Sequence, residues 1–403
     1  MKVGIDQIGY FTPNKYVDMV DLAHARNQDP NKFLIGIGQK RMSVADPTQD
    51  AVSMGINATL RYINKIDKSK VGLLIFGTES SVDQSKSGSL FVKSALKLDP
   101  TVRAFEVKEA CFGLTAGVMI AQDFVRLHPD QTAIVIGSDI ARYGINTAGE
   151  VTQGAGSVSL LISSNPRILE INEGHSAYSE DINDFWRPNY SKTAKVDGKY
   201  STQVYLNFFK HTFSDYKKQK GLETKDFAAI IYHLPFTKMG LKANRLAIEG
   251  VDEETNARLM DRFTASKELN ANVGNIYTGS LYLSLLSLLE NGGLKAGDLI
   301  GLFSYGSGAM AEFYSANVVE GYENELDKDA DEALLDKRKK LSVPEYEEIF
   351  SASLVDPQNN VELTSDEEKG KYYFAGICDD IRQYKVKWLV FAYIVVIIRH
   401  VER

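Results

Sequence analysis

Cys111 has a sequence position at which a thiol can become a nucleophile. It follows a short apolar segment and precedes Phe112, Gly113 and a helical pattern over Ala116–Leu127. The dipole and the free N–H groups at a helix N-terminus stabilise a thiolate. An inert buried cysteine is an equal alternative, because free cysteine is among the most buried residue types.

Two other titratable residues end apolar segments. Glu79 follows Val71–Gly77, and His233 follows Phe227–Tyr232. Desolvation raises the pKa of a carboxyl group, which suits Glu79 to carry a proton near neutral pH. A helix-capping carboxylate is the alternative for Glu79. A histidine without a catalytic role is the alternative for His233.

Weaker signals lie in the second half of the chain. The turn Gly306-Ser307-Gly308 offers backbone N–H groups that could bind an oxyanion. Lys238 and Lys242 are four positions apart, so on a helix they share one face that could meet phosphates or only solvent. No GxxxxGK[ST] or HExxH motif occurs, and no spacing of histidine and acidic residues indicates a metal site.

Apolar segments of strand length alternate with helical patterns. This alternation predicts a layered α/β fold, in which strands covered on both faces are nearly continuous apolar runs. The predicted strands are Val71–Gly77, Val102–Val107, Thr132–Gly137, Val158–Ile162, Phe227–Tyr232 and Leu299–Phe303. We expect helices at Ala116–Leu127 and Leu281–Glu290, and a loop at Gln153–Ser157.

The spacing of polar residues indicates a duplication. Cys111 and Asp139 are 28 positions apart, and Asn275 and Ser304 are 29 positions apart. We therefore expect two related halves, 1–165 and 166–385. Ligands of open α/β sheets bind beyond the carboxyl ends of the strands, which predicts that Glu79, Cys111, His233 and Asn275 converge.

Composition excludes several protein classes. The 403 residues exceed the roughly 250–300 that one core supports, and 44% apolar with 25% charged residues is an ordinary globular profile. The net charge of −7 argues against nucleic-acid binding. Two distant cysteines are too few for a disulfide framework and favour a reduced, cytoplasmic compartment. The first residues lack the apolar core of a signal peptide.

The C-terminal segment 386–403 contains an apolar run, Trp388–Ile398. Its 11 residues are fewer than the roughly 20 that span a bilayer. A buried strand, a non-native extension and a membrane anchor all stay open for this segment, although its length disfavours the anchor.

Several long phrases are similar to those of hydroxymethylglutaryl-CoA synthases of the Gram-positive bacterial type. The resemblance runs from the N-terminus to about Lys385, with its motifs in the family's order. The phrases are GTESS at Glu79, EACFGLTAG at Cys111, YHLPFTKMG at His233, GNIYTGSLYLSLLSLLE at Asn275, GLFSYGSG at Ser307, FLIGIGQ at Phe33–Gln39, DIARYG at Asp139–Gly144, TQGAG at Thr152–Gly156 and DFWRP at Asp184–Pro188.

The resemblance implies a thiolase-like, five-layered αβαβα fold working as a homodimer. It implies condensation of acetyl-CoA with acetoacetyl-CoA and water to 3-hydroxy-3-methylglutaryl-CoA, a step of the mevalonate route to isoprenoids. These acyl-CoA molecules are the only partners that it implies besides a second copy of the chain. No cofactor, metal, nucleic acid or membrane is implied.

The resemblance also implies roles for single residues. Cys111 is the nucleophile, Glu79 the general acid–base and His233 the group that polarises acetoacetyl-CoA. Asn275 and Ser307 lie beside His233. The implied acyl pocket is lined by Tyr143, Thr152, Ser201 and Tyr346, and the implied CoA arm is flanked by Lys238, Lys242 and Asp29.

The sequence departs from the family at Phe112, Val151 and 189–191, where the family has Tyr, Pro and Thr-Gly-His. Two rival functions follow from the same fold. A β-ketoacyl carrier-protein synthase of the initiating type also uses Cys, His and Asn, but lacks the strand-end glutamate, so Glu79 argues against it. A non-catalytic acyl-CoA-binding protein would have no need of the complete Cys–His–Glu set.

Overall fold

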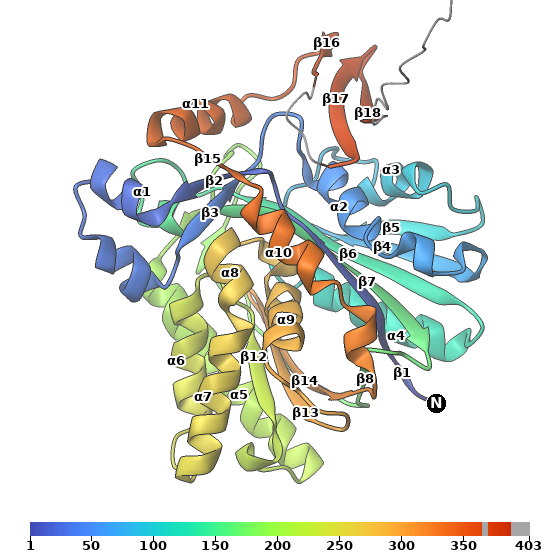
Figure 1. Ribbon diagram of the computed structural model, residues 1–403, viewed down its shortest axis with the longest axis vertical. Helices are drawn as coiled ribbons and strands as arrows, with labels where there is room; N and C mark the ends of the chain where they lie inside the picture. Colours follow the sequence, from blue (N-terminus) through green and yellow to red (C-terminus); the bar gives the residue numbers. More distant parts are fainter. Residues whose placement is uncertain (365–369, 388–403) are drawn as a thin grey trace, which may run out of the picture.

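The computed structural model describes residues 1–364 and 370–387. The predictions for Trp388–Ile398 and the rest of 388–403 lie outside the described residues. The chain forms a mixed α/β fold whose strands and helices alternate as the sequence predicts (Figure 1).

The N-terminal part of the main sheet runs in the order β1-β7-β6-β4-β5. These strands are β1 (Val3–Phe11), β4 (Val71–Gly77), β5 (Arg103–Val107), β6 (Thr132–Ala141) and β7 (Gly154–Ser164). Strand β4 is parallel to β5 and β6, whereas β7 is antiparallel to β6 and β1. The carboxyl ends of β4, β5 and β6 therefore meet at one edge.

The C-terminal part of the sheet continues through β8, which pairs with both β1 and β14. Its strands are β8 (Leu169–Ile171), β9 (Ser176–Ser179), β12 (Ala229–Tyr232), β13 (Leu299–Gly306) and β14 (Met310–Val318). Strands β12 and β13 are parallel, and β14 is antiparallel to β13. Both parts of the sheet thus contain a parallel pair of strands with an antiparallel strand beside it.

Helices cover the two parts of the sheet in alternating layers (Figure 1). Helices α2 and α3 cover one outer face, α4 and α9 lie in the middle, and α5 and α6 cover the other outer face, with α7 against α9 and β12. This arrangement confirms the αβαβα order. The bounds are α2 (Ala51–Thr59), α3 (Gly88–Ala95), α4 (Gly113–Leu127), α5 (Gly198–Lys220), α6 (Thr237–Ala247), α7 (Glu253–Ser266), α8 (Glu268–Val273) and α9 (Ser280–Asn291).

The two middle helices are apolar because sheets pack on more than one side of them. Every residue of α9 from Ser280 to Leu289 is buried, as expected for a helix that is apolar all round. Over the described residues, Ala110–Leu127 is the one helical segment long and apolar enough to cross a membrane. It contains α4, which lies in the core.

Smaller elements surround the layers (Figure 1). A three-stranded sheet, β15-β2-β3, packs with α1 and α11 around an apolar cluster that includes Tyr346. These and the remaining elements are β2 (Lys15–Asp18), α1 (Met19–Ala25), the π-helix η1 (Lys32–Ile37), β3 (Arg41–Val44), β10 (Phe185–Trp186), β11 (Lys195–Val196), α10 (Lys328–Asp336), β15 (Lys339–Lys340), α11 (Val343–Ser353), β16 (Val361–Glu362), β17 (Tyr372–Cys378) and β18 (Ile381–Val386).

Three strands are longer than predicted. Strand β6 continues to Ala141 instead of ending at Gly137. Strand β13 continues to Gly306, and β7 begins at Gly154, so most of the predicted loop Gln153–Ser157 is strand. A Cβ atom on Gly154 would lie 2.8 Å from the Asn275 carbonyl oxygen. The glycine therefore permits close packing of two backbones rather than a turn. The division into halves at 165 stays a prediction.

Candidate active site

The carboxyl ends of two strands lie directly against the start of α4. A Cβ atom on Gly77, the last residue of β4, would lie 2.7 Å from the Gly113 carbonyl carbon. A Cβ atom on Gly306, the last residue of β13, would lie 2.8 Å from the Phe112 backbone nitrogen. Glycine at both positions allows backbones from the two parts of the sheet to enclose Cys111.

Cys111 and Glu79 are in direct contact. The Cys111 Sγ donates a hydrogen bond to Glu79 Oε1 at 3.3 Å. Burial raises the pKa of Glu79 to about 8, with a further rise from the nearby charge of Asp139. Burial and the Glu79 carboxylate also raise the pKa of the Cys111 thiol. These effects outweigh the helix dipole that the sequence indicated, so the resting cysteine is a neutral thiol.

Asp139 anchors the segment that carries Glu79. Its buried Oδ1 accepts hydrogen bonds from the Glu79 backbone N–H at 2.7 Å and the Ser80 hydroxyl at 2.9 Å. Its Oδ2 accepts from the Thr278 hydroxyl at 2.6 Å. Asp139 thereby joins Glu79 to the segment that follows Asn275. Sequence reasoning placed Asp139 at a strand end but did not select it as a site residue.

Aromatic rings line the other side of Cys111. Tyr143, Phe185 and Tyr277 form one cluster with its sulfur-bearing side chain. The Tyr143 ring meets Phe185 edge-on, with centroids 5.8 Å apart. Asn275 Nδ2 donates a hydrogen bond to the Tyr143 hydroxyl at 3.3 Å. The sequence-predicted residues Tyr143 and Asn275 therefore do meet beside Cys111.

Phe185 and Tyr277 were missed by sequence reasoning, although both belong to recognised phrases, DFWRP and GNIYTG. Arg187 of the first phrase was missed too, and its guanidinium donates a hydrogen bond to the Glu79 carbonyl oxygen. Thr152 contributes its backbone, since its carbonyl oxygen accepts a hydrogen bond from the Asn275 N–H at 3.1 Å.

Ser201 and the turn at Ser307 meet at a buried carboxylate, Asp184. Asp184 Oδ2 accepts hydrogen bonds from the hydroxyls of Ser201 at 3.0 Å and Tyr305 at 2.7 Å. Its Oδ1 accepts from the Gly308 N–H at 3.0 Å. The Gly308 N–H is therefore occupied, unlike the free oxyanion donor that the glycine-rich turn predicted. Asp184 was not selected from the sequence.

His233 lies at the end of β12, beside β13. Its backbone N–H donates to the Phe303 carbonyl oxygen at 2.8 Å, three residues before Gly306. The residue is 1% exposed, and burial lowers its pKa to about 3, so the imidazole is neutral. Nδ1 is buried without a hydrogen-bond partner among the described residues.

Two of the predicted CoA-arm residues lie on α6, and the third, Asp29, precedes η1. Lys238 is half-buried and Lys242 is exposed on α6. Helix α6 packs against η1, where the Thr237 hydroxyl donates to the Gly38 carbonyl oxygen at 2.7 Å. Asp29, two residues before Asn31, is exposed, and its Oδ1 accepts the Asn31 N–H at 2.9 Å.

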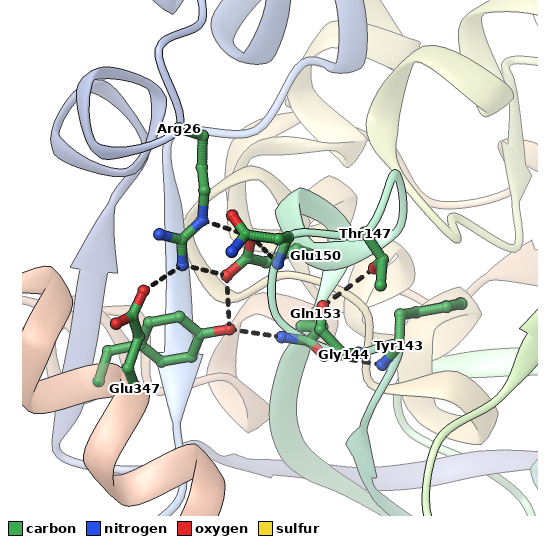
Figure 2. A network of polar contacts seen from close by, with 9 residues as sticks. Arg26, Tyr143, Gly144, Thr147, Glu150, Gln153 and Glu347 are labelled. Carbon is green, nitrogen blue, oxygen red and sulfur yellow. Dashed lines mark hydrogen bonds and ion pairs between the residues drawn. The ribbon is translucent and has the colours of Figure 1, made fainter.

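Tyr346, unlike Tyr143, does not belong to the apolar cluster around Cys111. Its hydroxyl bonds to Gln153 and Glu150, in a network behind the Tyr143 backbone (Figure 2). Within the described ranges, no group of three or more histidine, cysteine, aspartate or glutamate side chains is placed to hold a metal ion.

Comparison with known families agrees with this geometry. Residues 1–167 match the N-terminal domain model of hydroxymethylglutaryl-coenzyme A synthase, and residues 244–387 match the C-terminal domain model. The hydroxymethylglutaryl-CoA synthase of Enterococcus faecalis is 45% identical, with 96% of this chain and 100% of that protein covered.

Two solved structures are also similar. An HMG-CoA synthase crystallised with CoA superposes with a TM-score of 0.91 at 41% identity, covering 96% of this chain and 100% of the other. MvaS in complex with 3-hydroxy-3-methylglutaryl coenzyme A gives a TM-score of 0.86 at 36% identity, covering 96% and 99%. The chain therefore belongs to the hydroxymethylglutaryl-CoA synthase family.

Proposed function

We propose that this protein condenses acetyl-CoA with acetoacetyl-CoA and water to give 3-hydroxy-3-methylglutaryl-CoA and free CoA. The contact between Cys111 Sγ and Glu79 Oε1 is the observation that carries this proposal. It places a nucleophile and a proton carrier in contact, so that both can act on the same acetyl group. Family membership and the solved complexes with CoA and 3-hydroxy-3-methylglutaryl coenzyme A support the choice of substrates.

The first step is transfer of the acetyl group to Cys111. Glu79 takes the thiol proton along the existing hydrogen bond, and the sulfur attacks the acetyl-CoA carbonyl carbon. The bond to CoA breaks, and the leaving CoA thiolate recovers the proton from Glu79. Because the pKa of the buried thiol is raised, this local base speeds acetyl transfer at neutral pH.

The second step forms the carbon–carbon bond. Glu79, again a carboxylate, removes a proton from the methyl group of the acetyl-cysteine thioester. The resulting enolate carbon attacks the ketone of acetoacetyl-CoA, and the new alkoxide takes the proton back from Glu79. Water then cleaves the cysteine thioester, which leaves a free carboxylate on the product and restores the Cys111 thiol.

His233 has the properties needed to polarise the ketone of acetoacetyl-CoA. A neutral imidazole carries one N–H donor and one acceptor nitrogen, and the low pKa of His233 keeps it neutral at working pH. Asn275 and Ser307 flank the same space in this proposal. Lys238, Lys242 and Asp29 flank the CoA arm, where the two lysines attract its phosphates.

The unpaired edge of the main sheet supports a homodimer. Strand β5 ends the strand order and pairs only with β4 in the described part of the chain. On α4, Ile120 is 41% exposed and Leu127 is 78% exposed. An open strand edge is a template for pairing with another chain, and a two-fold axis would bury both copies of this edge.

The cellular setting follows from the chemistry. A catalytic thiol needs a reducing compartment, which supports a cytoplasmic protein. The product is a precursor in the mevalonate route to isoprenoids. The residues present supply the nucleophile, the acid–base group and the polarising group, so the proposed reaction uses no cofactor.

Mixing the protein with radiolabelled acetyl-CoA tests the proposal. Under reducing conditions we expect a thioester on Cys111, identified by peptide mass, and its release as labelled product once acetoacetyl-CoA is added. Cys378, an exposed free cysteine, provides the control, because Cys378→Ser should label normally. Absence of label on Cys111 would favour an acyl-CoA-binding protein without catalysis.

A further inference from the structure

A chain of hydrogen bonds leads from the backbone of Tyr143 to a buried ion pair that does not contact Cys111. Figure 2 shows Arg26, Glu150 and Gln153 in this network. The Tyr346 hydroxyl bonds to both Gln153 and Glu150. Arg26 follows α1, Glu150 and Gln153 lie just before β7, and Tyr346 is on α11. Segments from both ends of the chain therefore meet behind the acyl pocket.

Gln153 forms the end nearest the site. Its Oε1 accepts hydrogen bonds from the backbone N–H groups of Tyr143 at 2.7 Å and Gly144 at 3.1 Å. Only the carbonyl oxygen of the amide can accept, so these two bonds fix the orientation of the Gln153 side chain. Its Nε2 must then point away and donates to the Tyr346 hydroxyl at 2.8 Å.

The orientation of the Tyr346 hydroxyl proton follows from this contact. Since the Tyr346 hydroxyl oxygen accepts from Gln153, its own proton is free for Glu150 Oε1, 3.2 Å away. Arg26 holds both oxygens of Glu150, with Nε at 2.8 Å and Nη2 at 2.7 Å. This bidentate pairing fixes a buried carboxylate in one position. Arg26 Nη2 also binds Glu347 Oε1 at 2.6 Å, on the outer side of the network.

We propose that Arg26, Glu150, Tyr346 and Gln153 are positioning residues that hold the Tyr143 ring against Cys111 during acyl transfer. The inference rests on the proposed function, since Tyr143 lines the acyl pocket in it. The Tyr143 ring packs with Cys111 and its hydroxyl accepts from Asn275. Its backbone is otherwise held by Gln153, so a shift of Gln153 moves the ring.

The size of the effect follows from the groups left unpaired. Removing the shared acceptor leaves two buried backbone N–H donors unpaired, so the Tyr143 segment is free to shift, and we expect roughly 10- to 100-fold slower acetyl transfer. The Tyr143 ring is proposed to act on the acyl-transfer step and not on substrate binding, so its displacement should lower kcat and leave KM nearly unchanged. A merely structural role would instead lower the temperature of unfolding and leave the kinetics of folded protein intact.

The experiment compares Gln153→Leu, Tyr346→Phe and their double variant with wild-type protein. The control is Glu347→Gln, because Glu347 binds only the outer side of Arg26 and its side chain is 37% exposed. The measurements are the single-turnover rate of acetyl transfer from acetyl-CoA to Cys111, and kcat and KM for acetyl-CoA at saturating acetoacetyl-CoA. Thermal unfolding confirms that each variant is folded.

We expect Gln153→Leu to slow acetyl transfer at least tenfold with KM for acetyl-CoA within about twofold. Tyr346→Phe should slow it less. The double variant should be no slower than Gln153→Leu, because the two residues act in series. Glu347→Gln should match wild type within about twofold.

Two results would overturn the inference: folded Gln153→Leu at the wild-type rate, or independent, multiplying effects in the double variant. Should Gln153→Leu fail to fold, Tyr346→Phe decides, because it removes a single oxygen atom and keeps the ring. A wild-type rate of acetyl transfer in Tyr346→Phe would then reject the positioning role of this hydrogen-bond network. A wild-type protein that takes no acetyl group would reject the proposed function instead.

Discussion

At the centre of the site, burial raises the pKa of both the Glu79 carboxyl group and the Cys111 thiol. The Glu79 carboxylate raises the pKa of the thiol further, whereas the hydrogen bond from Cys111 lowers the pKa of Glu79. A carboxyl group with its pKa near neutrality can accept and return a proton within one catalytic cycle. In the proposed mechanism Glu79 therefore takes up the Cys111 thiol proton first and a proton of the bound acetyl methyl group second.

The raised pKa of Glu79 predicts a pH profile. Because the carboxylate is the active base, kcat/KM should fall about tenfold per pH unit below the pKa of about 8. Rates measured from pH 5.5 to 9.5 check this. The matched control is Glu109→Gln, since partial desolvation also raises the pKa of Glu109. If the inflection disappeared in Glu109→Gln, the titrating group would be Glu109 and the assignment to Glu79 would be wrong.

Residues found from the sequence and residues found only in the structure differ in how they act. Cys111, Glu79 and His233 carry their chemistry in their own side chains and occur at strand ends, where it could be recognised. Asp139 and Asp184 act by accepting hydrogen bonds from segments far apart in sequence. No local pattern specifies such partners, so these two aspartates could not be selected.

The helices and strands around the site were mostly predictable, because apolar runs of strand length are covered on both faces. The extension of β7 to Gly154 was not, since glycine there serves close packing against the segment before Asn275. Helix α11 has local signals, with a capping box between Ser342 and Glu345. Its role in presenting Tyr346 depends on tertiary contacts.

The close approach of β13 to α4 predicts the effect of Gly306→Ala. The added Cβ would lie 2.6 Å from the Glu109 carbonyl oxygen and 2.8 Å from the Phe112 backbone nitrogen. Such overpacking costs about 1–3 kcal/mol and displaces one of the two segments. We expect lower stability in urea unfolding and slower acetylation of Cys111.

Gly198→Ala is the control for that substitution, because no atom lies within 4 Å of the added Cβ. It begins α5, so alanine should leave stability unchanged or raise it by about 0.4–1 kcal/mol. Equal losses in both variants would mean that the effect of Gly306→Ala is not crowding.

For the whole molecule, the layered architecture places the reacting groups between two parts of one sheet, with β5 at its open edge. We expect a solution mass of twice 44.8 kDa by light scattering. Ile120→Lys on α4 should shift the mass toward the monomer, whereas Val355→Lys, at an apolar residue that is exposed outside α4, should not. A monomer for the unaltered chain, or a shift in Val355→Lys alone, would place the interface elsewhere.

The assignment of Glu79 as the base for carbon–carbon bond formation is tested most directly by Glu79→Ala. Acetyl transfer to Cys111 and condensation with acetoacetyl-CoA are followed separately on the same sample. We predict that this variant still acquires the acetyl group, although more slowly, and that condensation falls by about 10²–10⁴-fold. Condensation at the normal rate in Glu79→Ala would contradict the account.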